Sequence, residues 1–192
     1  MRIVLPEERP RVEVPIKDGH IALISPVLPS DRRYFARGIE EMSVESRYTR
    51  FGQGVAHFSE WELNYLTDVD QRAHVALGAA VGGQVAGVGR YIVTEEDCPE
   101  VAITVIDEFQ NMGVGTALFW ALVAIARSDG LSELCFEVVA DNHPVIHMMS
   151  KLGTHSRRTD DVLEAVFGLE NLPRTNLDDE FVALLRRVRG QC

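Results

Sequence analysis

Basic residues, long apolar stretches and leader-like segments are all scarce in this sequence. Its 192 residues carry 19 basic and 29 acidic side chains, giving a formal net charge of −10. Proteins that bind nucleic acid present a basic surface to the phosphates, so this charge excludes a general nucleic-acid binder. No segment approaches the roughly 18 consecutive apolar residues of a membrane-spanning helix, and the first 15 residues lack the apolar core of a signal peptide. We therefore expect neither a nucleic acid nor a membrane among its partners.

Cysteine is scarce as well, with Cys98, Cys135 and Cys192 scattered along the chain and no CxxC spacing. An odd number of scattered cysteines argues against a disulfide framework and is typical of proteins in a reducing cytoplasm. Cys135 lies within an apolar run and is expected in the core. We therefore predict a cytoplasmic protein, and the hydrophobic content of 46% predicts one compact domain with short terminal additions.

Hydrophobic periodicity and turn signals predict an alternating series of strands and helices. The expected strands are Gly19–Val27, His74–Val81, Gln84–Val93, Glu100–Ile106, Leu131–Val139 and a hairpin over Ser156–Leu169. The expected helices cover residues 30–42, 59–67, 113–127, 144–152 and 178–189, while 43–58 is expected to be less regular. This order predicts a mixed sheet of about seven strands with helices on both faces, an α/β fold of mixed type.

The predicted domain organisation has three parts. Residues 1–15 are rich in proline and charge and form a loosely held arm, and residues 16–170 form the domain. Residues 171–192 form an extension with a short helix whose apolar stripe packs either on the domain or on a second copy. The sequence leaves both a monomer and a homodimer open.

The stretch Val101–Ala117 carries the strongest functional signal. An apolar run is followed by Gln110-x-x-Gly113-x-Gly115 and then by a helical segment. At a junction of strand, glycine-containing loop and helix, several backbone N–H groups lack partners and lie at the positive end of the helix dipole. Such a junction binds phosphate, so the sequence predicts a phosphorylated cofactor.

The same motif closely resembles motif A of the GNAT superfamily of acetyl-CoA-dependent N-acetyltransferases, and Asn142 followed by Lys151-Leu152-Gly153 resembles motif B. The order of elements over residues 19–169 also follows that family and implies its fold. A narrower likeness, to the catalytic domain of bacterial Pat-type protein lysine acetyltransferases, lies upstream. It is carried by Ser46-Arg47-Tyr48-x-Arg50-Phe51, Glu62-Leu63-x-x-Leu66-Thr67-x-Val69-Asp70, Val75-Ala76-Leu77 and Gly87-Val88-Gly89-Arg90-Tyr91.

This resemblance implies acetyl-CoA as cosubstrate, no metal, and direct attack of a neutral amine on the thioester. A lysine amine has a pKa of about 10.4, so it needs a base near pH 7. Glu100, which opens the central strand, is our choice for that base; the alternative is a surface carboxylate ending an acidic loop. A backbone N–H of Val105 or Ile106 would polarise the thioester carbonyl. The expected cofactor-binding residues are Val105, Ile106, Gln110, Met112, Gly113, Val114, Gly115, Thr116 and Asn142.

Several assignments stay open at this level. Asn142 either binds the cofactor or caps a helix. Many members of the family place a tyrosine seven residues after this Asn as general acid, but Met149 stands there and cannot donate a proton. His143 and His147 have a metal-compatible spacing without a third ligand. The acceptor is expected to be a protein lysine, with a small amine, or a non-catalytic sensor of acyl-CoA, as alternatives.

Overall fold

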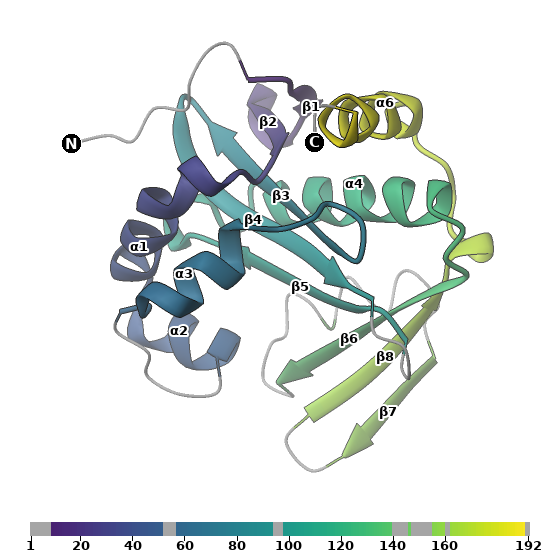
Figure 1. The fold of residues 1–192 in the computed structure, drawn as a ribbon. Helices are drawn as coiled ribbons and strands as arrows, with labels where there is room; N and C mark the ends of the chain where they lie inside the picture. The colour runs from purple at the N-terminus through teal and green to yellow at the C-terminus, as the bar shows by residue number, and fades with distance from the viewer. Residues whose placement is uncertain are drawn as a thin grey trace.

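The computed structural model describes residues 9–51, 57–93, 98–139, 146, 155–159 and 162–190 (Figure 1). The strands are β1 Val12–Pro15, β2 Ile21–Pro26, β3 His74–Val81, β4 Gln84–Ile92, β5 Glu100–Val105, β6 Glu133–Val139, β7 His155–Thr159 and β8 Val162–Gly168. The helices are α1 Arg32–Glu41, α2 Val44–Phe51, α3 Glu60–Thr67, α4 Val114–Ser128 and α6 Asp178–Arg189. Four one-turn 3₁₀ helices join them in the described residues, η1 Lys17–Gly19, η2 Pro29–Asp31, η3 Asp107–Phe109 and η4 Leu169–Asn171.

The described strands form one eight-stranded sheet in the order β1-β2-β3-β4-β5-β6-β8-β7. Its neighbours pair antiparallel except β5 and β6, which are parallel. The predicted mixed sheet is therefore confirmed. The strand beyond the seven expected is β1, in which Val12 pairs with Ile24 and is buried, so residues 12–15 are not the loosely held arm that the sequence predicts.

Helices cover both faces of the sheet, as predicted: α4 lies on one face and α1 and α3 lie on the other (Figure 1). The approach of α4 is close because Gly89 has no side chain. A Cβ atom there would lie 3.2 Å from both Leu118 Cβ and Leu122 Cδ1. Helix α6 packs on α4 and buries Phe181, Leu184 and Leu185 in the common core. The apolar stripe of the C-terminal extension is thus covered by the domain itself.

Strands β5 and β6 share a single residue pair among the described residues, Glu100 with Cys135. Figure 1 shows the two strands diverging from that shared end. A single pair leaves the inner edges of both strands without each other as hydrogen-bonding partners further along. The sheet therefore contains a wedge-shaped gap between two parts, β1 to β5 and β6 to β8.

Two expectations about the local structure are wrong. Residues 44–51 form helix α2 rather than an irregular segment. Cys98 and Cys135 form a disulfide with an S–S distance of 2.02 Å, and Cys135 is half-buried. The two cysteines meet because the pairing of Glu100 with Cys135 brings the residues before β5 against β6. Their separation of 37 residues gives no local signal of this contact. Cys192 lies outside the described residues.

Candidate functional site

The N-terminus of α4 lies where the sequence places the phosphate site. Gly113 is its N-cap, with φ of 96°, a left-handed conformation that glycine adopts without steric cost. The first N–H of the helical ladder is that of Ala117, which donates to the Gly113 oxygen at 3.0 Å. The N–H groups of Val114, Gly115 and Thr116 precede that ladder, and no side-chain cap from the described residues covers this end. The helix start can therefore bind an anion with backbone groups alone.

Hydrogen bonds from η1 hold the loop that precedes α4. The Lys17 backbone N–H donates to the Met112 oxygen at 3.0 Å, and Lys17 Nζ donates to the Asn111 oxygen at 2.8 Å. The carbonyls of the loop thus point toward η1. Lys17 also adds a positive charge beside the helix start, which favours an anion further. Sequence reasoning missed Lys17, because 94 residues separate it from Asn111 and nothing local to either marks the contact.

Gln110 and Asp107 connect this loop to α2. Gln110 Nε2 lies 3.3 Å from the Val105 oxygen and 3.1 Å from Asp107 Oδ1. Ser46 Oγ donates to Asp107 Oδ1 at 2.6 Å, and the Ser43 N–H donates to Asp107 Oδ2 at 3.0 Å. Partial burial raises the pKa of Asp107, but the hydrogen bonds from Ser46 and Ser43 outweigh it and hold the pKa below its ordinary value. The Gln110 side chain therefore orders the loop rather than lying among the free N–H groups.

The backbone of β5 alternates between its two neighbours. The Ile106 N–H donates to the Ala86 oxygen at 2.9 Å, so that group is used on the β4 side. In an antiparallel ladder the hydrogen-bonding direction alternates along the strand, so the backbone groups of Val105 and Ile103 face the gap beside β6. Of the two backbone N–H groups that the sequence offers for polarising the thioester, that of Val105 alone faces the gap.

Glu100 lies at the shared end of β5 and β6, and it is exposed. Side chains alternate along a strand, so Glu100 shares the α1 face of the sheet with Ala102, Thr104 and Ile106. Five residues of strand, about 16 Å, separate it from Val105, and three residues, about 10 Å, separate it from Ile103. Over either distance a proton can reach Glu100 only through water.

A buried cation lies on the same face of the sheet. Arg90 Nη1 is 3.1 Å from His74 Nε2, Arg90 Nη2 donates to the Leu66 oxygen at 3.3 Å, and Arg90 is only 4% exposed. Burial and the charge of Arg90 lower the pKa of His74 from 6.5 to about 4, against the opposing effect of Asp70. His74 is consequently neutral near pH 7 and can accept a hydrogen bond from Arg90.

The remaining candidates cannot be placed. Asn142, His143, His147 and Met149 lie outside the described residues. Within the described part of the chain, no three His, Cys, Asp or Glu side chains come together as a metal site, and no helix is long and apolar enough to cross a membrane.

Comparison with known proteins identifies the family. The model of the acetyltransferase (GNAT) family matches residues 34–154. Acetyltransferase Pat of Mycolicibacterium smegmatis is 32% identical over 146 residues, which are 74% of this chain but 44% of that protein, so the chain spans less than half of its length. Acetyltransferase PA5475 of Pseudomonas aeruginosa is 28% identical over 151 residues, 76% of this chain and 81% of that protein.

The crystal structure of the GNAT domain of S. lividans PAT has the same fold. Its TM-score is 0.76 at 27% identity, and the match covers 85% of this chain and 99% of that chain. The predicted GNAT fold is thereby confirmed. The chain belongs to the acetyltransferase (GNAT) family and is an acyltransferase.

Proposed function

We propose that this acyltransferase moves the acetyl group of acetyl-CoA to an amine, most favourably the ε-amine of a lysine on a protein. The observation that carries the proposal is the uncapped start of α4, the first α-helix after β5, the strand that borders the gap. A CoA pyrophosphate would lie on the N–H groups at the helix start, and its pantetheine arm would lie along β5 as an added strand does. Similarity to Pat and to the S. lividans PAT domain supports a lysine acceptor.

In this proposal Glu100 removes a proton from the protonated amine through water, because only the neutral amine attacks. The nitrogen then forms a bond to the thioester carbon, and the carbonyl oxygen takes the negative charge. The N–H group of Val105 stabilises that oxygen. The C–S bond breaks as the carbonyl reforms, CoA leaves as a thiolate, and the nitrogen loses its second proton to water. Because Met149 cannot donate a proton, the thiolate takes its proton from water.

The cofactor contacts follow the geometry of the loop. We assign the pyrophosphate to the backbone between Gln110 and Thr116, with Met112, Gly113, Val114 and Gly115 inside that span and Lys17 as an added cation. Asn142 stays a prediction for a further contact to the cofactor. No metal takes part in the proposed step.

Replacement of Glu100 by glutamine tests the base. Loss of a general base lowers turnover about 10²- to 10⁴-fold, while the affinity for acetyl-CoA stays unchanged because Glu100 lies at the opposite end of β5 from the helix start. Glu133→Gln, an exposed glutamate at the start of β6, is the matched control and should behave as wild type. Release of CoA and the dissociation constant of acetyl-CoA are the two measurements. Undiminished turnover of Glu100→Gln would refute the assignment.

Two alanine variants test the pyrophosphate site. A Cβ at Gly115 would meet Val105 Cγ2 at 3.5 Å, an ordinary contact, so Gly115→Ala should keep its stability and lose affinity for CoA. Gly113→Ala puts a side chain on a residue with φ of 96° and should cost about 1–2 kcal/mol of stability as well. Urea unfolding and calorimetric titration with CoA separate the two effects. A Gly115→Ala variant that binds CoA as tightly as wild type would place the phosphates elsewhere.

The acceptor class is tested by incubating the enzyme with labelled acetyl-CoA and a cell lysate. Label in precipitated protein supports a lysine acceptor, and label in the soluble small molecules supports a small amine. Binding of acetyl-CoA without release of CoA would support a sensor. Exposed aromatic side chains on α2 and α3, Tyr48 at 59% and Trp61 at 73%, favour contact with a protein.

We retain a catalytic domain of residues 16–170, extended at its edge by β1, with residues 171–192 packed against it through α6. A cytoplasmic location and a monomer or homodimer stay predictions from the sequence. The Cys98–Cys135 disulfide removes the support that unpaired cysteines gave to the predicted location.

A further inference from the structure

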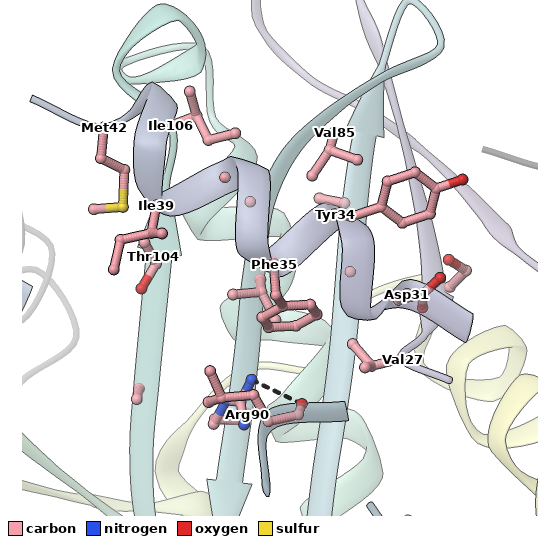
Figure 2. Close-up of a pocket in the computed structure, with 18 of the residues that line it drawn as sticks. Val27, Asp31, Tyr34, Phe35, Ile39, Met42, Val85, Arg90, Thr104 and Ile106 are labelled. Carbon is pink, nitrogen blue, oxygen red and sulfur yellow. Dashed lines mark hydrogen bonds between the residues drawn. The ribbon is translucent and has the colours of Figure 1, made fainter. Parts of the chain in front are cut away.

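A cavity of about 100 Å³ lies between α1 and the sheet (Figure 2). Its floor includes one row of side chains that crosses four strands, since Ser25 pairs with Gly78, Gly78 with Val88, and Val88 with Thr104. Three strand spacings separate the ends of this row, about 14 Å. The roof is α1, from Tyr34, Phe35 and Gly38 to Ile39 and Met42 (Figure 2). The cavity is therefore elongated, and it runs inward from β5 beneath the helix.

The cavity is open because small residues face each other across it. A Cβ at Gly38 in α1 would meet nothing within 4 Å, and a Cβ at Gly78 would meet only the Ser25 oxygen at 3.9 Å. Neither glycine has a positive φ, so the backbone does not require glycine at either position. Ser25 Oγ is also buried without a hydrogen-bond partner among the described residues. The chain thus leaves space here that larger side chains would fill.

The chemistry of the walls favours a hydrocarbon over an amine. Most lining residues are apolar, and the one carboxylate among them, Asp31, is held by two hydrogen bonds from Arg9 at 2.8 and 2.7 Å. Arg90 adds a second positive charge, while its neighbour His74 is neutral near pH 7. Among the described lining residues the charged side chains, Arg9, Asp31 and Arg90, sum to a net positive charge, which disfavours a protonated lysine.

The β5 end of the cavity adjoins the place assigned to the thioester. Ala102, Thr104 and Ile106 line the cavity, and they alternate along β5 with Ile103 and Val105, whose backbone faces the gap. We propose that the cavity receives the hydrocarbon chain of an acyl-CoA longer than acetyl-CoA, in the range from butyryl to hexanoyl, so that α1 selects the donor. This inference rests on the proposed function, because it takes the thioester to lie beside β5.

Titration calorimetry of the whole chain with CoA, acetyl-CoA, butyryl-CoA and hexanoyl-CoA tests the inference. Each buried methylene should tighten binding about fourfold, so butyryl-CoA should bind about 15-fold more tightly than acetyl-CoA. Gly38→Leu fills the cavity without a clash at its Cβ and should abolish this dependence on chain length while leaving acetyl-CoA binding unchanged. Ala36→Leu, on the same helix but away from the cavity lining, should keep the dependence. If Gly38→Leu does not fold, Gly38→Ala should reduce the dependence by a smaller factor.

Equal affinities for the three acyl-CoA compounds in the wild type would overturn the acyl pocket and leave the proposed function standing. A Gly38→Leu variant that weakens only the amine acceptor, seen as a raised KM for the amine, would assign the cavity to the acceptor and overturn the inference as well. If the folded wild type bound no CoA compound at all, the proposed function would fail first, and the inference with it.

Discussion

Acidification should destabilise the protein through His74, which is half-buried beside Arg90. The pKa of His74 is about 4 in the folded protein and 6.5 in the unfolded chain. Below pH 6.5 the unfolded chain therefore binds a proton that the folded protein does not. Because the folded-state pKa of His74 is lower than the unfolded-state pKa, His74 does not reduce the free energy of unfolding above pH 6.5. That free energy falls as the pH drops from 6.5 toward 4.

The size of the effect follows from the two pKa values. Between pH 7.5 and pH 5.0 the linkage amounts to about 2 kcal/mol, and partial exposure of the imidazole to solvent reduces the expected loss to about 1 kcal/mol. The Asp70 carboxylate opposes the shift and stays ionised at pH 5, because hydrogen bonds from the backbone of His74, Arg72 and Ala73 outweigh its burial and hold its pKa below the ordinary value. Its charge therefore does not change over this range.

Urea unfolding of wild type and His74→Gln at pH 7.5 and pH 5.0 measures this difference. Glutamine can still accept a hydrogen bond from Arg90 but does not titrate. We expect the wild type to lose about 1 kcal/mol more than His74→Gln on acidification. Equal losses in wild type and His74→Gln would show that the environment of His74 does not disfavour its charged form.

Two further predictions concern the connections that hold the fold together. Reduction of the Cys98–Cys135 disulfide, which closes a loop over 37 residues, should cost up to about 4 kcal/mol of unfolding free energy. The stability of Cys98→Ser should not change with reductant. A wild type that is equally stable with and without reductant would contradict the pairing. Arg189 donates to both oxygens of Asp129, at 2.6 and 2.7 Å, and Arg189→Met should destabilise the protein by about 1–3 kcal/mol at pH 7. Burial raises the pKa of Asp129, but the bonds from Arg189 and Tyr91 outweigh it and lower the pKa, so their contribution is present above about pH 4 and lost as the pH falls through the lowered pKa. Thermal unfolding from pH 7 to pH 3 should show a weaker acid dependence in Arg189→Met, and an identical dependence would exclude the ion pair.

The sequence was sufficient to predict a helix or strand where the segment has a regular hydrophobic period and also residues that mark its ends. The glycine pair Gly82-Gly83 fixes the turn between β3 and β4, and the capping box of Ser59 and Glu62 fixes the start of α3. Strand β1 has four residues and a proline at its end, too few for alternation to show. Helix α2 was missed because no capping signal was recognised at its start, where Ser43 Oγ accepts a hydrogen bond from the Ser46 N–H.

The features of the candidate site likewise divide into those that the sequence predicted and those that it did not. Gly113 and the uncapped helix start were predicted because strand, loop and helix are contiguous in sequence. The contacts of Lys17 with the loop and of Ser46 with Asp107 join segments that are far apart in the chain, and neither carries a motif of its own. The cavity beneath α1 also escaped prediction, since it depends on which small residues the strand register places opposite Gly38.

Among the described residues, β5 and β6 pair at one end alone. The two parts of the sheet, β1 to β5 and β6 to β8, are therefore joined at that end and separate further along. The Glu100–Cys135 pair and the Cys98–Cys135 disulfide lie together at that end. The disulfide therefore links the two parts of the sheet without occupying the opening between them. A strand-like ligand in the opening would supply the hydrogen bonds that the two inner edges do not make with each other. The protein's sheet would then be completed by its cosubstrate, and the twist between the two parts of the sheet would set how well the cosubstrate fits.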